Sequence, residues 1–322
     1  MYLAYNALMT RTLILGGAGL IGSHLTEALL KTGMEVHVLD TLEYCRSDNL
    51  TQVRDHPKLT FHKANACDFD KWNIGRQPWD EIYHLAGIVA TADFVAHPVE
   101  AFKVSVIPLM QILDYQIKSP HPVKLLFASS SEVYGDPKVL PTPETYSGVL
   151  DFCGPRSGYS EGKRAGETLI ISHAQEHGSI CARVRIFNTF GERETATGNL
   201  VSTMALDALK YGEIYVHGSG RQTRTLLYVE DCVMALKSAM EVHSDLAINI
   251  GGSQSMRVSQ IASMVKKAVG GKVKIVHSEQ PAHDIMKRQP DIRLAHVLLL
   301  WSPTTPIEIG IERVVAYLRE RL

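Results

Sequence analysis

Buried-strand and amphipathic-helix patterns alternate along the first half of the chain. Residues 12–17 read TLILGG, an apolar run typical of a strand buried on both faces, and the run stops at glycines. Apolar residues then recur at helical spacing until Gly33, and a second strand pattern, EVHVLD, covers residues 35–40. Further strand patterns begin at residues 59, 81, 123 and 182. This order predicts an α/β fold built on a doubly wound parallel sheet.

The pattern loosens after Asn188 and predicts a second, smaller unit. Helical patterns cover residues 201–212 and 260–270, a final amphipathic helix begins near Pro306, and strand patterns lie between them. We expect residues 10–186 and 225–250 to form a nucleotide-binding domain. The ranges 187–224 and 251–322 are expected to form a C-terminal substrate-binding lobe.

The glycines after the first strand predict a site for a dinucleotide. Gly16, Gly19 and Gly22 have the spacing G-x-x-G-x-x-G between a strand and a helix, which lets backbone amides approach a pyrophosphate at the helix N-terminus. Asp40 ends the second strand about 20 residues further on, where a carboxylate accepts hydrogen bonds from the ribose hydroxyls. A carboxylate there repels a 2′-phosphate, so we expect a Rossmann-type domain that binds NAD rather than NADP.

Tyr159 and Lys163 predict proton transfer at a carbinol. They are four residues apart, which places both on one face of a helix. An ammonium group near the phenol is expected to lower its pKa from about 10, so that the tyrosine can take a hydroxyl proton during oxidation by NAD. Ser130, at the end of the strand that begins at residue 123, is the expected hydroxyl partner of Tyr159, although serines in this position are also common turn residues.

Composition narrows the expected partners and location. The chain has 322 residues and a formal net charge of −1, with no long basic run, so neither nucleic acid nor an anionic membrane is an expected partner. Its five cysteines contain no C-x-x-C pair, and an odd count fits a reducing compartment. We see neither a signal-peptide pattern nor an apolar run long enough for a membrane span, and expect a cytoplasmic protein. The 14 histidines show no metal-binding spacing, so no metal is expected.

Five segments together resemble the extended short-chain dehydrogenase/reductase family, whose members modify nucleotide sugars. They are SSSEVYGDP, GPRSGYSEGKRAGETL, RIFNTFGER, GSGRQTRTLLYVED and KRQPDI, and the resemblance covers nearly the whole chain from about Arg11. Within the family the chain is most similar to UDP-glucuronate decarboxylases. The resemblance implies a UDP-sugar substrate and a homodimer formed by the helices near residues 97–118 and 157–177.

The resemblance also assigns residues to roles. It implies that Ser130 assists Tyr159 and that Ser131 and Glu132 belong to the decarboxylation machinery. It implies substrate contacts for Asn188 at the diphosphate and for Arg224 and Arg288 at carboxylate or phosphate groups. Besides the glycines, Asp40, Tyr159 and Lys163, the residues expected to contact the cofactor are Leu20, Ile21, Asp68, Leu85 and Ala86.

The expected reaction is decarboxylation of UDP-glucuronate through a C4 ketone. The C6 carboxylate is β to that ketone and leaves as carbon dioxide, giving UDP-xylose, its 4-keto precursor, or both. Glu132 is expected to handle the C5 proton or to order a water that does so. Related 4-epimerases and 4,6-dehydratases are the alternatives, but the dehydratases have aspartate where this chain has Ser131. A non-catalytic nucleotide-sugar binder is a further alternative, and it would not need Tyr159, Lys163 and Glu132 together. The nucleotide base stays open.

Overall fold

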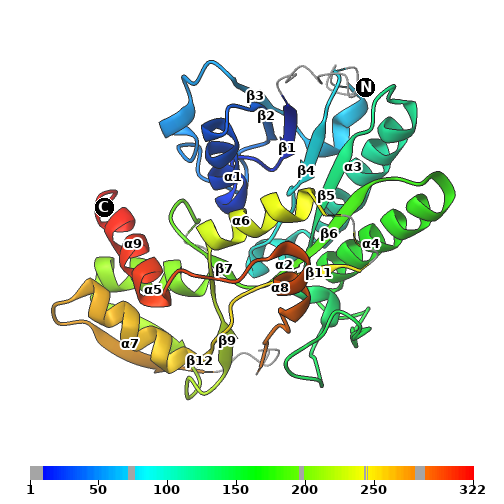
Figure 1. The fold of residues 1–322 in the computed structure, drawn as a ribbon. Helices are drawn as coiled ribbons and strands as arrows, with labels where there is room; N and C mark the ends of the chain where they lie inside the picture. The colour runs from blue at the N-terminus through cyan, green and yellow to red at the C-terminus, as the bar shows by residue number, and fades with distance from the viewer. Residues whose placement is uncertain (1–9, 72–76, 196–198, 243, 245, 280–286) are drawn as a thin grey trace.

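At the centre of the protein lies a seven-stranded parallel sheet with the order β11-β6-β5-β4-β1-β2-β3 (Figure 1). The computed structural model describes residues 10–71, 77–195, 199–242, 244, 246–279 and 287–322. The strands are β1 (Arg11–Leu15), β2 (Glu35–Asp40), β3 (Leu59–Lys63), β4 (Glu81–His84), β5 (Lys124–Ser130), β6 (Cys181–Ile186) and β11 (Ile248–Ile250). The predicted doubly wound α/β fold is confirmed.

Helices cover both faces of this sheet, as Figure 1 shows. The apolar residues of β1 alternate between the two faces: Leu13 and Leu15 pack in the core shared with α3 and α4, whereas Ile14 packs in the core shared with α1 and α6. All three side chains are fully buried, which explains the unbroken apolar run in the sequence. The helices are α1 (Leu20–Lys31), α3 (Pro98–Lys118), α4 (Ser157–His177) and α6 (Val229–Met240).

The strand order creates a crevice at the carboxyl ends of β1 and β4. β1 pairs with β2 on one side and with β4 on the other, so the chain connections diverge at β1. Ligands of doubly wound sheets bind at such a point. The segments that follow β1, β4 and β5 meet there, and the last of them is a short 3-10 helix, η4 (Ser131–Tyr134).

A second apolar core joins helices and strands of the C-terminal part of the chain. Met204, Ile214, Ile261 and Val314 are buried together in it. Its elements are α5 (Leu200–Tyr211), α7 (Val258–Val269), α9 (Ile307–Arg319), β8 (Glu213–His217) and β13 (Lys274–Ser278). The shorter strands pair as β7 (Thr189–Phe190) with β10 (Leu227–Tyr228), and β9 (Thr223–Thr225) with β12 (Ser255–Arg257).

The two-lobe division of the chain stays a prediction, and one helix packs differently from it. α8 (Arg293–Leu299) lies within the range 251–322 but contributes Ala295 and Leu299 to the core of the central sheet. The sequence pattern missed this helix because seven residues span fewer than two turns, too few for a helical period to show. Among the described residues, no helix is both long enough and apolar enough to cross a membrane.

Candidate active site

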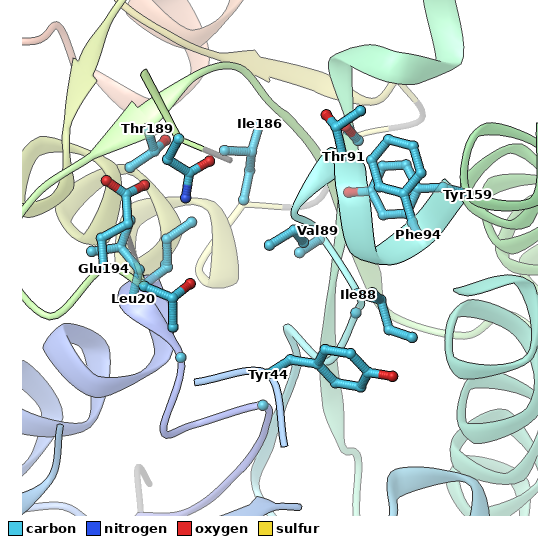
Figure 2. Close-up of a pocket in the computed structure, with 18 of the residues that line it drawn as sticks. Leu20, Tyr44, Ile88, Val89, Thr91, Phe94, Tyr159, Ile186, Thr189 and Glu194 are labelled. Atoms are coloured by element: carbon cyan, nitrogen blue, oxygen red, sulfur yellow. The ribbon is translucent and has the colours of Figure 1, made fainter. Parts of the chain in front are cut away.

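A cavity of about 910 Å³ joins the crevice of the central sheet to the second core. Figure 2 shows Tyr159 and Phe94 on one wall and Leu20 and Glu194 on the opposite wall. Every residue expected to contact a ligand lines this cavity except Asp68. A volume of this size is ample for a drug-sized or nucleotide-sized ligand.

The glycine turn after β1 is shaped for close backbone approach. Gly16 has a φ of +78°, and a Cβ atom built on it would lie 2.7 Å from the Ala86 nitrogen. A Cβ on Gly22 would lie 2.2 Å from the Gly16 carbonyl oxygen, so α1 can pack against the turn only with glycine there. Gly19 is the N-cap of α1, and no side chain caps the helix there by a hydrogen bond. The turn therefore presents the N-terminal amides of α1 to the cavity, as a pyrophosphate requires.

Asp40 ends β2 at the rim of the same turn. Its Oδ2 accepts a hydrogen bond from the Ala18 N–H at 3.0 Å, and its Oδ1 accepts one from the Leu42 N–H at 2.9 Å. Oδ1 also accepts a hydrogen bond from the Cys45 thiol at 3.7 Å, whereas Oδ2 has a second lone pair for a further donor. The backbone bonds therefore fix Asp40 in place, and ribose hydroxyls can bond to Oδ2 directly and to Oδ1 in place of the weak thiol contact.

Asp68 lies outside the cavity lining, unlike the sequence-based expectation. The chain enters the 3-10 helix η2 (Ala66–Lys71), in which the Asp68 N–H bonds to the Asn65 carbonyl oxygen at 3.0 Å. This turn presents the preceding residues, Asn65, Ala66 and Cys67, to the cavity.

Tyr159 and Lys163 lie on the buried face of α4, next to the end of β5. The Lys163 Nζ donates a hydrogen bond to the Ala128 carbonyl oxygen at 2.8 Å and lies 5.7 Å from the centre of the Tyr159 ring. Ser130 makes a side-chain hydrogen bond to Tyr159. The structure thus brings the three predicted partners together.

The expected low pKa of Tyr159 is not produced by the chain's own groups. Burial raises the pKa of Tyr159 to about 12, and the Ser130 hydrogen bond opposes this shift only in part. Burial also lowers the pKa of Lys163 to about 7. The sequence-based expectation weighed the lysine charge but not the cost of burying both groups.

Phe94 is a neighbour of Tyr159 that the sequence pattern did not indicate. Its ring stacks on the Tyr159 ring with a centroid distance of 4.9 Å and an interplanar angle of 10° (Figure 2). Phe94 comes from α2 (Thr91–Ala96), a helix of six residues in the segment that follows β4. The stacking fixes the plane of the tyrosine ring.

Glu132 is held between two arginines at the carboxyl end of β5. Arg156 donates two hydrogen bonds to it, from Nε to Oε2 at 3.0 Å and from Nη2 to Oε1 at 2.6 Å. Arg288 donates from Nη1 to Oε1 at 2.5 Å. Burial opposes the ionisation of Glu132, but the charges of Arg288 and Arg156 outweigh it and lower its pKa to about 2. Glu132 is therefore a carboxylate at neutral pH.

Arg288 has unused hydrogen-bonding capacity at this position. Its Nε and Nη2 are buried and have no hydrogen-bond partner among the described residues. Buried guanidinium donors without partners are costly, and an anionic ligand group would satisfy them. Arg288 can therefore bind a carboxylate or phosphate while Arg156 still holds Glu132.

Arg156 itself was missed by the sequence reasoning. It precedes Tyr159 by three residues at the start of α4, so helical spacing alone would have placed it near the same face. Its guanidinium carbon also lies 5.2 Å from the centre of the Phe94 ring. Arg156 thus links Glu132 to the aromatic stack on Tyr159.

The remaining predicted substrate residues line the cavity on the side of the second core. Asn188 lines the cavity, and its backbone carbonyl oxygen accepts a hydrogen bond from the Leu227 N–H at 2.9 Å. Arg224, in β9, donates from Nη1 to the Thr223 carbonyl oxygen at 2.9 Å and also lines the cavity. Both are placed to contact a ligand that extends from Tyr159 toward α5.

Comparison with known proteins gives a consistent set of similarities. The pattern that defines the "NAD dependent epimerase/dehydratase family" matches residues 12–251. The chain is 36% identical to UDP-glucuronic acid decarboxylase 1 of Xenopus tropicalis over 313 residues, which are 97% of this chain and 73% of that protein. It is 34% identical to UDP-glucuronic acid decarboxylase 5 of Arabidopsis thaliana over 314 residues, 97% of this chain and 90% of that protein. The crystal structure of a UDP-glucose 4-epimerase from Thermotoga maritima superposes with a TM-score of 0.87 at 28% identity, covering 97% of this chain and 99% of that one.

Proposed function

The chain belongs to the NAD dependent epimerase/dehydratase family, and from this premise we propose that it is a lyase that decarboxylates UDP-glucuronate. The observation that carries the proposal is the Ser131-Glu132 pair beside Tyr159, with Arg288 offering unpartnered donors to an anionic group. Its curated relatives of up to 36% identity are UDP-glucuronic acid decarboxylases, which supports the same substrate.

NAD is the cofactor of this family, and the cradle at the end of β1 fits it. When bound, it would accept a hydride from the C4 carbinol of the sugar and return one later. The residues proposed to hold it are the glycine turn with Leu20 and Ile21, the carboxylate of Asp40, the backbone at Leu85 and Ala86, and the side chains of Tyr159 and Lys163.

We predict a strong preference for NAD over NADP. Asp40 is fixed by two backbone hydrogen bonds, so it cannot turn away from a 2′-phosphate, and NAD should bind at least roughly tenfold more tightly. Calorimetric titration with each dinucleotide measures the ratio. An Asp40→Ser variant should have a smaller ratio of NAD to NADP affinity. Equal affinities of the wild-type protein for the two dinucleotides would contradict the proposed contact of Asp40 with the ribose.

The first chemical step needs a base at the C4 hydroxyl. We propose that Tyr159 Oη removes this proton, aided by Ser130, while the protonated form of Lys163 supplies positive charge near the ring. Phe94 and the Ala128 carbonyl hold the tyrosine and the lysine in position, so little reorganisation is needed when the sugar arrives.

The second step breaks the bond between C5 and C6. Arg288 binds the C6 carboxylate, the carboxylate leaves as carbon dioxide, and the bonding electrons move through C5 and C4 onto the C4 oxygen. Tyr159 and Ser130 then donate hydrogen bonds to the enolate oxygen. A proton added to C5 gives the 4-keto pentose, which is reduced in place to UDP-xylose or released.

The ionisation of Glu132 supports one of its two expected roles. A carboxylic acid with a pKa of about 2 is ionised at neutral pH and has no proton to give to C5. We therefore propose that Glu132 orients a water molecule that protonates C5. Arg156 keeps the carboxylate in this orientation while Arg288 binds the substrate through its Nε and Nη2.

Product analysis separates this function from its rivals in the family. A 4,6-dehydratase acts on a neutral hexose and needs an acid at position 131, where this chain has a buried serine. A 4-epimerase keeps C6 of its sugar, whether that sugar is a neutral hexose or a glucuronate, as for the UDP-glucuronic acid 4-epimerase of Bacillus cereus. Mass spectrometry of products from a small panel of UDP-, dTDP- and CDP-linked hexoses and glucuronates tests the proposal and identifies the base. We expect UDP-glucuronate to lose C6 and give a UDP-pentose or its 4-keto form. Conversion of the neutral hexoses alone would favour an epimerase or dehydratase, and no conversion of any sugar would favour a binder.

We further propose a cytoplasmic homodimer formed by α3 and α4. These helices pack against each other, and α3 exposes large apolar side chains at Val99, Met110 and Ile117, each more than half exposed. Met110 and Ile117 are seven residues apart and so lie on one face. Exposed apolar residues in a row are typical of an interface.

A charge on this face should dissociate the dimer. Met110→Glu would bury a carboxylate in the apolar contact, and we expect sedimentation to show mainly monomers at concentrations where the wild-type protein is dimeric. Val297→Glu, which introduces the same charge at an exposed position on α8, is the matched control. A monomeric wild-type protein, or an unchanged dimer in the Met110 variant, would contradict the proposed interface.

A further inference from the structure

Glu194 is a buried acid in the cavity wall that the proposed reaction does not use. It follows β7 and lies across the cavity from Tyr159, near Leu20 (Figure 2). The residue is only 4% exposed, unlike the acids Glu43 and Glu100 that also line the cavity. A buried carboxyl group with no catalytic role calls for a partner.

The protein satisfies one oxygen of Glu194 and leaves the other without a partner. The Ser202 hydroxyl, in the first turn of α5, donates a hydrogen bond to Oε2. Oε1 is buried and has no partner among the described residues. Because Oε2 already accepts a hydrogen bond, Oε1 is the oxygen that would carry the proton of a neutral carboxyl group.

No cation in the described surroundings compensates a charge on Glu194. On its own segment, Arg193 is bound to Glu27 and Gln52, and Glu192 is bound to the Tyr228 hydroxyl. The charged or titratable groups of the neighbouring helices are Glu27, His24 and Lys31 on α1, and Asp207, Lys210 and Tyr211 on α5. None of them forms an ion pair or hydrogen bond with Glu194.

Burial therefore controls the protonation of this group. It raises the pKa of Glu194 to about 8, and the Ser202 hydrogen bond lowers it only in part. At neutral pH the side chain is largely a neutral acid, which can donate as well as accept a hydrogen bond.

Two helix N-termini meet the cavity beside this acid. α1 begins at Leu20, and α5 begins at Leu200 after Asn199, which makes no side-chain cap. Both residues line the cavity. Free N–H groups at helix starts favour anions, and a protonated carboxyl adds one more donor, whereas an ionised one would repel the same anion.

We propose that Glu194 is a protonated hydrogen-bond donor to a diphosphate oxygen of a bound nucleotide, so that ionisation of Glu194 weakens nucleotide binding. The inference rests on the proposed function, because that function supplies two ligands with a diphosphate, NAD and the nucleotide sugar. Glu194 thereby sets the upper pH limit for binding of one of them.

Calorimetry across pH tests this role without relying on turnover. The NAD-loaded protein is titrated with UDP-glucose, whose diphosphate stays ionised throughout, and nucleotide-free protein is titrated with NAD. In one of the two titrations we expect the Kd to rise roughly tenfold or more between about pH 7 and about pH 9.5 as Glu194 loses its proton. The same titration near pH 8, repeated in buffers of different ionisation enthalpy, should show proton uptake. The titration that responds identifies the ligand.

The variant Glu194→Gln shows whether the pH dependence of binding comes from Glu194 or from another titratable group. Glutamine is nearly isosteric, keeps an amide donor and cannot ionise, so the rise in Kd and the proton uptake assigned to Glu194 should both disappear. Glu192→Gln, two residues away and outside the cavity lining, should retain both. Parallel pH profiles for the wild-type protein and Glu194→Gln would overturn the role of Glu194 alone, as would wild-type affinities that do not change with pH. Absence of UDP-glucose and NAD binding at every pH would remove the proposed function and this inference with it.

Discussion

Replacing Tyr159 with phenylalanine should slow C4 oxidation by roughly 10² to 10⁴, the usual contribution of a positioned general base. The substitution removes only the hydroxyl. Stacking on Phe94 at 4.9 Å depends on the ring and should persist, so the fold and substrate affinity should change little. Stopped-flow absorbance of NADH after mixing holoenzyme with UDP-glucuronate measures this step directly.

A second tyrosine provides the control for this experiment. Tyr146 is partly buried, packs near Tyr134 and does not line the cavity, so Tyr146→Phe should oxidise substrate at close to the wild-type rate. If Tyr159→Phe also reduces its bound NAD at that rate, then Tyr159 is not the base.

Glu132→Gln should lower the rate of carbon dioxide release or of C5 protonation by at least about tenfold while leaving C4 oxidation intact. An amide has one acceptor oxygen instead of two, so it cannot accept both Arg156 bonds together with the Arg288 bond, and the two arginines lose their common anchor. Carbon-13-labelled substrate separates the loss of carbon dioxide from the uptake of solvent deuterium at C5. Equal slowing of NAD reduction would show that Glu132 acts through the fold and not at C5.

A matched buried ion pair distinguishes stability from chemistry. Glu167 accepts hydrogen bonds from Arg185 at 2.7 Å and 2.9 Å, and it lies outside the cavity lining. Glu167→Gln should therefore destabilise the fold and spare carbon dioxide release in the folded protein.

Glu132 also stabilises the fold in a pH-dependent way. Its folded pKa of about 2 lies below the ordinary 4.5, so this stabilisation is complete above about pH 4.5 and is lost as the pH falls through about 2. Acid unfolding of Glu132→Gln should lack this contribution.

The fold and the core of the site followed from local patterns, and the rest depends on packing. Strand runs, the glycine turn and the four-residue spacing of Tyr159 and Lys163 are signals within one segment, and the sheet brings their ends together. Phe94 lies in a helix of six residues, too short to show a period, so its stacking could not be foreseen. The Arg288 contact with Glu132 joins positions 156 residues apart, and only the fold reveals it.

The pKa values show a second limit of sequence reasoning. Charge neighbours can be guessed from spacing, but burial cannot, and burial dominates at Tyr159, Lys163 and Glu194. Helical spacing could have drawn attention to Arg156, three residues before Tyr159. Its role nevertheless depends on the position of Glu132 in the fold, because an arginine at a helix start is usually an exposed residue.

The central claim, loss of C6 from a glucuronate through a C4 ketone, is tested most directly with UDP-glucuronate that carries carbon-13 at C6. The account predicts that labelled carbon dioxide is released in amounts equal to the UDP-pentose and its 4-keto form, as detected by mass spectrometry. Recovery of all label in UDP-glucuronate or its 4-epimer, while a neutral UDP- or dTDP-hexose is epimerised or dehydrated, would contradict it.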